Sequence, residues 1–170
     1  NVMLGRYRIA LRQFRRVLAL RRRHVYATYG LAFTLWRLHR PHEAVTAFEA
    51  FFRARGSGWT GAHIYVCALL DAGRLDDAAR FADELYARYP LESAAMAAVA
   101  AVRLKQERYT DAAELAEAAT RRWSLRSFSW QVWGEALLAL GDAEAAMAKF
   151  RRLLAQDAPT FPGRSAGIVE

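Results

Sequence analysis

Alanine recurs at intervals of 34 residues, and this recurrence limits what the chain can fold into more than any other feature of the sequence. No insertion or deletion breaks the interval across the chain. The repeated alanines are Ala10, Ala44, Ala78, Ala112 and Ala146. Four residues after each of them lies phenylalanine or a further alanine, at Phe14, Phe48, Ala82, Ala116 and Phe150. A fixed period of this length indicates an array of similar units, in which function resides on an extended surface.

Within each unit, the apolar residues predict two amphipathic helices joined by a short turn. They follow the i, i+3, i+4, i+7 spacing of one helix face. In one unit these positions are Ala62, Tyr65, Val66 and Leu69 in the first helix and Ala78, Phe81, Ala82 and Leu85 in the second. Gly73 between them can adopt the left-handed conformation that ends a helix and lets an antiparallel partner follow. One hairpin cannot bury its apolar faces alone, so neighbouring pairs must stack.

The register also predicts where the helices and units lie. Second helices are expected at roughly 41–55, 75–89, 109–122 and 143–156, and an opening helix at roughly 6–22 after a turn at Gly5. The turn position holds glycine again at Gly141, but His39 and Glu107 occupy it in two units, which leaves their turn geometry open. We expect an all-α superhelical solenoid of about 4.5 units. Its predicted divisions are a partial repeat at 1–24, repeats at 25–58, 59–92, 93–126 and 127–158, and an extended tail at 159–170.

This unit resembles the tetratricopeptide repeat, from residue 5 to about 158. The resemblance rests on the period, the alanines, the turn glycines and a small residue at the eighth position of the unit. These small residues are Ala32, Val66, Ala100 and Gly134. The usual tryptophan at the fourth position is clear only as Trp130, and the usual proline near the end of the unit remains only as Pro90.

The resemblance implies a non-enzymatic scaffold or chaperone-like module that binds a protein or peptide, and it favours a bacterial protein. Tetratricopeptide proteins in bacteria commonly serve secretion or envelope assembly. Two alternatives stay open at this point. The array could be a segment of a larger enzyme such as a glycosyltransferase, or an arginine-rich nucleic-acid or regulatory module.

The resemblance also implies a groove on the concave side, lined by the second, fifth, ninth and twelfth positions of each first helix. The predicted partner-binding groove comprises Tyr26, Tyr29, Phe33, Trp36, His63, Leu70, Phe128 and Gln131. The remaining groove positions are Thr60, Cys67, Ala94, Ala97, Ala101, Leu104, Glu135 and Leu138. This face is largely apolar, and such a patch is seldom left uncovered. Alternatively, an upstream helix packs on the aromatic residues and buries part of them.

One branch of the family is disfavoured by the same positions. Co-chaperone members hold a C-terminal carboxylate with lysine, asparagine and arginine side chains on the concave face, because a carboxylate needs several donors at once. The corresponding positions here are Tyr29, Gly30, Phe33 and Ala94. None of these side chains is cationic, so we do not expect a carboxylate clamp.

Positive charge is concentrated near the N-terminus. The chain has a formal net charge of +8, but residues 1–58 hold twelve arginines against two glutamates, a balance of +10. A predicted basic face comprises Arg8, Arg12, Arg15, Arg16, Arg22 and Arg23. It suits an acidic protein, anionic lipid headgroups or nucleic acid. Nucleic acid is disfavoured because no stacking aromatics are interleaved with these arginines. The alternative is a solvated face in a chain that uses 23 arginines and only two lysines.

The candidates for chemistry are sparse. His63 and Cys67 lie four residues apart on a helix, as a thiolate–imidazole pair requires, but the repeat supplies no third orienting group. His39, His42 and Glu43 are potential metal ligands, but they flank Pro41 at a turn and lack an evident fourth ligand. We therefore predict no catalytic residue, no metal site and no cofactor.

Composition and the chain ends bear on cellular setting. The sequence contains no run of eighteen apolar residues and one cysteine, Cys67, which predicts no membrane span and no internal disulfide. The compartment stays open between cytoplasm and periplasm, with the cytoplasm favoured.

Repeat arrays need polar caps, yet the last helix presents Phe150, Leu153 and Leu154. We therefore expect a homo-oligomer, a longer parent array, or a tail folded back through Phe161, Ile168 and Val169.

Overall fold

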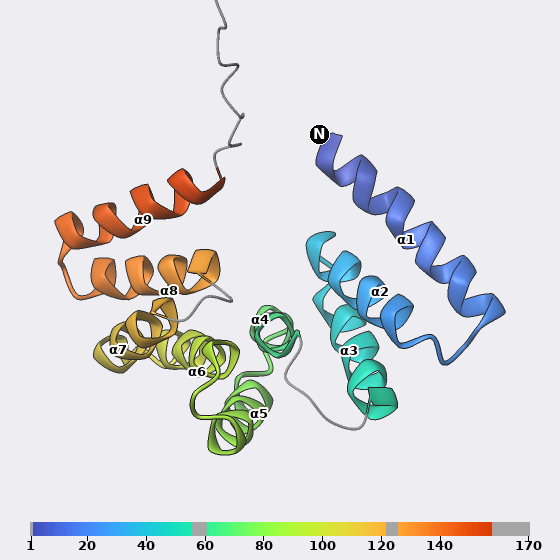
Figure 1. Cartoon of the computed structure of the whole chain (residues 1–170), viewed down its shortest axis with the longest axis horizontal. Helices are drawn as coiled ribbons and strands as arrows, with labels where there is room; N and C mark the ends of the chain where they lie inside the picture. Colours follow the sequence, from blue (N-terminus) through green and yellow to red (C-terminus); the bar gives the residue numbers. More distant parts are fainter. Residues whose placement is uncertain (1, 56–60, 122–125, 158–170) are drawn as a thin grey trace, which may run out of the picture.

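The protein is described here by a computed structural model that covers residues 2–55, 61–121 and 126–157 (Figure 1). These residues form helices and turns, and none of them forms a β-strand. The helices are α1 (Val2–Leu20), α2 (Val25–Arg37), α3 (Pro41–Arg55), α4 (Ala62–Asp71), α5 (Leu75–Arg88), α6 (Ser93–Lys105), α7 (Tyr109–Thr120), α8 (Arg126–Ala139) and α9 (Ala143–Asp157). The predicted second helices correspond to α3, α5, α7 and α9. Thr60 and the tail at 159–170, with Phe161, Ile168 and Val169, lie outside the described residues.

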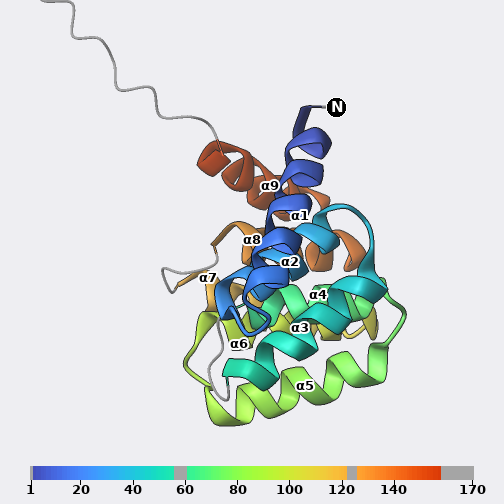
Figure 2. The same cartoon turned by 90° about the vertical axis from the view of Figure 1, so that its right-hand side faces the viewer.

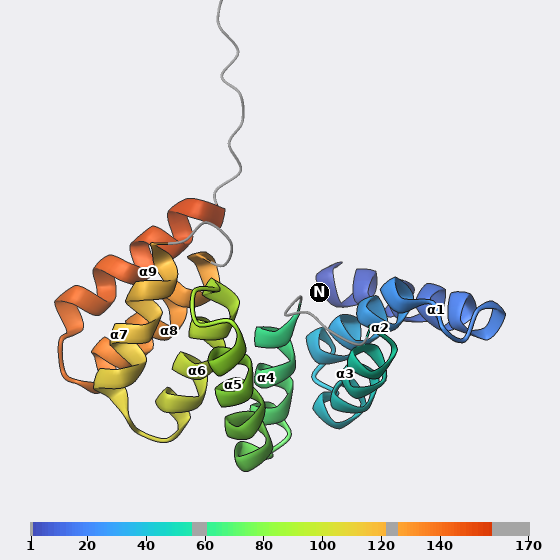
Figure 3. The same ribbon diagram turned by 60° about the horizontal axis from the view of Figure 1, so that its bottom comes forward.

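The helices are arranged as an arc with α1 at one end and α9 at the other (Figure 1). Each first helix contacts the second helix of its own unit, as α2 contacts α3 and α8 contacts α9. Stacking continues between units, where α4 contacts α6 and α6 contacts α8. Seen from a second direction, the pairs follow one another in chain order from α1 to α9 (Figure 3). The predicted all-α solenoid is confirmed. No helix in the described part of the chain is both long and apolar enough to cross a bilayer.

The repeated alanines lie where helices cross. Ala44, Ala78 and Ala112 are fully buried and Ala146 is buried, whereas Ala10 on α1 is half-buried. Two of the phenylalanines four residues later, Phe14 and Phe150, are matched by glycines on the facing helix. A Cβ atom on Gly30 would lie 2.4 Å from Phe14 Cζ, and one on Gly134 would lie 2.7 Å from Phe150 Cζ. These two glycines therefore make room for aromatic rings between helices.

The four turns between paired helices share one geometry, although only two of them contain glycine. Gly73 and Gly141 have φ angles of 74° and 88°, and His39 and Glu107 have φ angles of 55° and 61°. In each turn the next residue's N–H donates to a carbonyl five residues earlier, as Arg108 N does to Arg103 O at 2.9 Å. This is the Schellman arrangement that ends a helix. The turn is thus kept at His39 and Glu107 despite the loss of glycine.

Glu107→Gly is therefore expected to raise the free energy of unfolding by about 0.5–1 kcal/mol. A non-glycine residue at positive φ is strained by about 1–2 kcal/mol, and part of the gain is offset by the greater freedom of glycine in the unfolded chain. Urea titration monitored by circular dichroism would measure the change. Glu107→Ala is the matched control, because it removes the same side chain and keeps the strain. Equal stabilisation by both variants would contradict the explanation.

The predicted turn at Gly5 is wrong. Helix α1 runs without interruption from Val2 to Leu20. Gly5 lies inside it, and a Cβ atom at Gly5 would meet no neighbouring atom within 4 Å. The apolar face continues across this glycine, because Leu4, Tyr7 and Leu11 lie on one side of the helix and are half-buried or buried. A glycine inside a helix costs only about 1 kcal/mol relative to alanine, so packing of this face determines the outcome.

Candidate protein-binding surfaces

The first two predicted groove residues have different environments. Tyr26 is 81% exposed. Tyr29 is half-buried, because its ring lies between α2 and α3, 6.2 Å from the Phe48 ring and 5.3 Å from the Phe51 ring. Burial raises the pKa of the Tyr29 hydroxyl. A Cβ atom on Gly61, at the start of α4, would lie 2.4 Å from Tyr29 Cε2. Tyr29 is therefore part of the packing between units, and Tyr26 is the residue that a partner can reach.

Phe33 and Trp36 belong to a cluster formed between α1 and α2. The Phe33 ring centroid lies 6.4 Å from that of Tyr7 and 6.1 Å from that of Trp36. The Arg37 guanidinium lies 5.3 Å from the Tyr7 centroid and 5.9 Å from the Trp36 centroid. We call Tyr7, Phe33, Trp36 and Arg37 the aromatic cluster. Phe33 and Trp36 were predicted. Tyr7 and Arg37 were missed, although Tyr7 is in the apolar stripe of the opening helix and Arg37 follows Trp36.

The Trp36 indole also connects two units. Its Nε1 donates a hydrogen bond of 2.8 Å to Asp71 Oδ2 at the end of α4. Beside this bond lies an open hollow of about 380 Å³, lined by Trp36, His39, Pro41 and Asp71. Trp36 is half-buried, so a partner segment on this face would meet the edge of the indole together with a carboxylate.

The groove does not continue over α6. Its expected groove positions there are buried: Ala94 is 1% exposed, Ala97 is 0% exposed and Ala101 is 6% exposed. The neighbouring first helices cover them, since the His63 ring of α4 lies 5.4 Å from the Phe128 ring of α8. The expectation of one groove along four units is therefore wrong at this point. Small alanine side chains on α6 let the helices on either side approach each other.

The other predicted groove residues lie on either side of this closure. Leu70 is half-buried and packs with the core around α6 and α8. Gln131 is exposed, and its Nε2 donates to Glu135 Oε1 at 2.9 Å. The structure thus brings Phe33 and Trp36 together, pairs His63 with Phe128, and leaves Tyr26 and Gln131 apart on the surface.

The pair of His63 and Cys67 is held in its uncharged form. Burial lowers the pKa of His63 to about 4. Burial is also the main reason that the pKa of Cys67 is raised to about 12, with a further contribution from the negative charges of Asp71 and Glu135. A nucleophilic cysteine needs a lowered pKa, so this environment opposes thiolate chemistry. Within the described ranges, no three His, Cys, Asp or Glu side chains are grouped as metal ligands would be.

All members of the predicted basic face are exposed. They are Arg8, Arg12, Arg15 and Arg16 on α1 and Arg22 and Arg23 in the turn after it. Arg15 lies 3.9 Å from Glu43. Among the ion pairs of the described residues, this is the one that involves a member of the face. The face therefore carries several positive charges that are not neutralised by neighbouring carboxylates.

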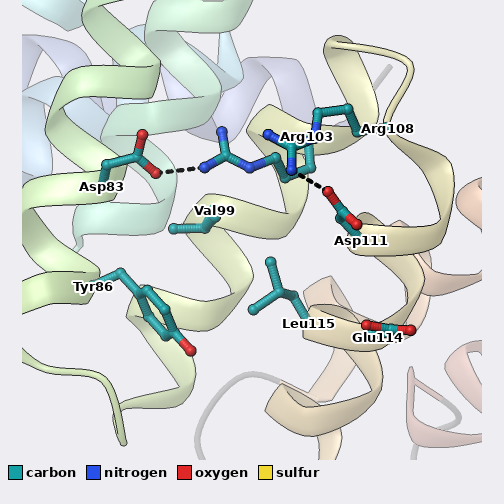
Figure 4. A pocket seen from close by; sticks show the side chains of 8 residues that line it. All are labelled: Asp83, Tyr86, Val99, Arg103, Arg108, Asp111, Glu114 and Leu115. Carbon is teal, nitrogen blue, oxygen red and sulfur yellow. Dashed lines mark hydrogen bonds and ion pairs between the residues drawn. The ribbon is translucent and has the colours of Figure 1, made fainter.

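A second hollow, of about 320 Å³, lies between α5, α6 and α7 (Figure 4). Its arginines are already paired with carboxylates: Arg103 Nη2 lies 2.8 Å from Asp83 Oδ1, and Arg108 contacts Asp111. None of its lining residues belongs to the predicted groove or to the predicted basic face, so the sequence did not indicate this hollow. Its paired charges leave less free positive charge for a ligand than the face of α1 does.

Comparisons with known proteins agree on the architecture. The chain is similar to the structure of MamA residues 41 to the end from Desulfovibrio magneticus RS-1, with a TM-score of 0.62, 17% identity, and coverage of 92% of this chain and 91% of that chain. It is also similar to a crystal structure of MamA protein, with a TM-score of 0.60, 17% identity, and coverage of 89% and 83%. A third similar structure is YrrB, described as a TPR protein with an unusual peptide-binding site, with a TM-score of 0.55, 14% identity, and coverage of 94% and 82%.

These identities are low, so the likeness to solved structures concerns the fold. No curated protein matches the chain in sequence. The profile of the family described as Tetratricopeptide repeat matches residues 3–56, 32–93, 66–127 and 100–160. Together these matches cover residues 3–160, which include all five repeated alanines and the four turns between paired helices. The chain therefore belongs to the tetratricopeptide repeat family.

Proposed function

We propose that the protein is a non-enzymatic interaction scaffold that holds a segment of a partner protein against α1 and α2, at Tyr26 and the aromatic cluster. The observation that carries the proposal is the exposure of aromatic side chains on α2, where Tyr26 is 81% exposed and Phe33 and Trp36 are half-buried. Tyrosine, tryptophan and arginine are the residues that binding hot spots favour, and Trp36 lies beside Arg37. For the cellular setting we propose bacterial secretion or envelope assembly, where tetratricopeptide proteins commonly serve, with a chaperone-like role.

The surroundings of the cluster determine the chemistry of the partner. Phe33 and Trp36 favour apolar or aromatic side chains. The Arg37 guanidinium and the excess of arginine in residues 1–58 favour an acidic segment. A segment that combines apolar residues with Asp or Glu meets both requirements. The similar structure of YrrB is described as having a peptide-binding site, which is consistent with a peptide as the ligand.

Selection from a random peptide library displayed on phage would test this proposal. We expect the selected peptides to combine apolar and acidic residues. The double variant Tyr26→Ala/Phe33→Ala should raise their Kd by at least about tenfold, because truncation of a hot-spot residue costs about 2 kcal/mol. Fluorescence anisotropy of labelled peptides would measure the Kd.

Met147→Ala is the matched control, because Met147 is an apolar residue of α9 that is 51% exposed. Its binding should equal that of the unmodified chain. Peptides that bind the Tyr26→Ala/Phe33→Ala variant with unchanged Kd would show that the partner surface lies elsewhere.

A further inference from the structure

The outward face of α1 combines arginines with exposed aliphatic side chains. One row of this helix, with residues three or four positions apart, consists of Ile9, Gln13, Arg16 and Leu20, and all four are exposed. Arg8 and Arg12 lie beside this row and are also exposed. Ile9 is 52% exposed and Leu20 is 81% exposed. The opposite side of α1 packs on the array through Leu11, which is 7% exposed, and through Phe14 against Gly30.

No helix of the described residues covers this face of α1. The helix is the terminal element of the arc (Figure 1), and when that end is turned toward the viewer α1 lies in front of α2 and α3 (Figure 2). A helix of 19 residues is about 28 Å long. The outward face can therefore meet a flat surface along its whole length without a clash with the other described helices.

The charge of this end is of one sign. The first acidic residue of the sequence is Glu43, so neither α1 nor α2 contains a carboxylate. Glu43 itself lies near Arg15, at 3.9 Å, and pairs with Arg40. Arg21, Arg22 and Arg23 follow Leu20 directly and are exposed. Leu20 is thus flanked by positive charge on both sides along the chain.

The exposed aliphatic residues distinguish between anionic partners. Ile9 and Leu20 gain little against a nucleic acid, whose affinity comes from phosphate contacts, base contacts and stacking. The row offers no aromatic side chain for stacking. By contrast, apolar residues that project among arginines are what an interfacial helix inserts below the headgroups of an anionic bilayer. A nucleic acid would thus use only the arginines, whereas a lipid surface uses both features of the face.

We propose that the outward face of α1 docks the protein on an anionic membrane surface. In this arrangement Arg8, Arg12 and Arg16 contact lipid headgroups, and Ile9 and Leu20 insert below the headgroups, at their boundary with the acyl chains. The array then lies beside the bilayer, with its aromatic cluster on the inward side of α1 and α2 still accessible. This surface is independent of the peptide-binding proposal.

Cosedimentation with vesicles of phosphatidylcholine, with and without phosphatidylglycerol, tests the proposal. The chain should bind the vesicles that contain phosphatidylglycerol, and the bound fraction should fall as the salt concentration is raised. The double variant Arg12→Gln/Arg16→Gln should lower the partition coefficient about 30-fold, because each arginine near the surface contributes about fivefold. Ile9→Gln/Leu20→Gln should lower it by about tenfold.

Arg88→Gln/Arg151→Gln is the matched control, since it removes two exposed arginines from α5 and α9. It should change the partition coefficient by about twofold or less. An environment-sensitive dye at Gln13→Cys, in a Cys67→Ser background, should shift its emission to the blue on binding, whereas a dye at Arg88→Cys should not. All replaced arginines, Ile9, Gln13 and Leu20 are exposed, so these variants should keep the helical circular dichroism spectrum.

Several results would overturn the proposal. One is the absence of binding to phosphatidylglycerol vesicles at low salt. Another is an unchanged partition coefficient for Ile9→Gln/Leu20→Gln, since the face would then be used without insertion. Binding of duplex oligonucleotides without binding of vesicles would assign the face to nucleic acid instead.

Discussion

Replacing Phe48 with alanine is expected to lower the free energy of unfolding by about 3–5 kcal/mol. Phe48 is fully buried on α3, between two units. Its ring centroid lies 6.2 Å from Tyr29 on α2 and 5.7 Å from Tyr65 on α4. Truncation would leave a cavity between the unit of α2 and α3 and the unit of α4 and α5, and it would remove aromatic contacts on both sides. Urea titration followed by circular dichroism would measure the loss.

Tyr26→Ala is the matched control, because it removes an aromatic ring that is 81% exposed. Its effect should stay within about 0.5 kcal/mol, as for most surface substitutions. The same result would show that a loss of peptide binding caused by Tyr26→Ala alone does not come from unfolding. A loss below about 1 kcal/mol for Phe48→Ala would contradict the assignment of this contact as a main support between units.

The period made the fold predictable because the same helix–helix contacts recur in every unit. Ala44, Ala78 and Ala112 are buried at equivalent crossings, so one correct register locates many helices at once. The positions of the turns could be predicted from the same register. His39 and Glu107 adopt positive φ values like those of the glycines, because the flanking helices impose the geometry and outweigh the local preference. The same principle explains the error at Gly5, where the apolar face of α1 outweighs a glycine.

The surface was less predictable, because position in the repeat gives the direction of a side chain and not what covers it. Tyr29 and Ala97 both occupy groove positions. Nevertheless, Tyr29 packs toward α3 and the start of α4, and Ala97 is buried. Whether a groove stays open depends on side-chain sizes in the two neighbouring units. The alanines of α6 let His63 and Phe128 meet, and only the assembled array reveals that contact.

That contact leads to a second large effect: stability should fall by about 2–3 kcal/mol as the pH is lowered from 6.5 to 4. Burial lowers the pKa of His63 to about 4, from an ordinary value of 6.5. The unfolded chain therefore binds a proton in this range that the folded chain excludes. Stability from the neutral imidazole is complete above pH 6.5 and is lost as the pH falls. Urea titrations across this range would measure the effect.

His63→Phe separates this effect from the titration of carboxylates. The replacement keeps an aromatic ring against Phe128 and cannot be protonated, so its stability should change by about 1 kcal/mol or less between pH 6.5 and 4. His42→Asn, at an exposed position, should follow the unmodified chain. Equal losses for the unmodified chain and His63→Phe would assign the pH dependence to carboxylates.

The location of His63 determines what its protonation does. Its ring joins α4 to α8 across the buried alanines of α6, and its Nδ1 has no hydrogen-bond partner in the described part of the chain to accommodate an added proton. A charged imidazole would have to leave this apolar contact to be solvated. Acidification should therefore loosen the closure over α6 before the rest of the array unfolds. Cys67 lies one turn from His63, and its reaction with a neutral disulfide reagent would report this opening. At pH 5 the reaction should be faster than the low thiolate concentration at that pH predicts. His63→Phe should abolish this excess rate.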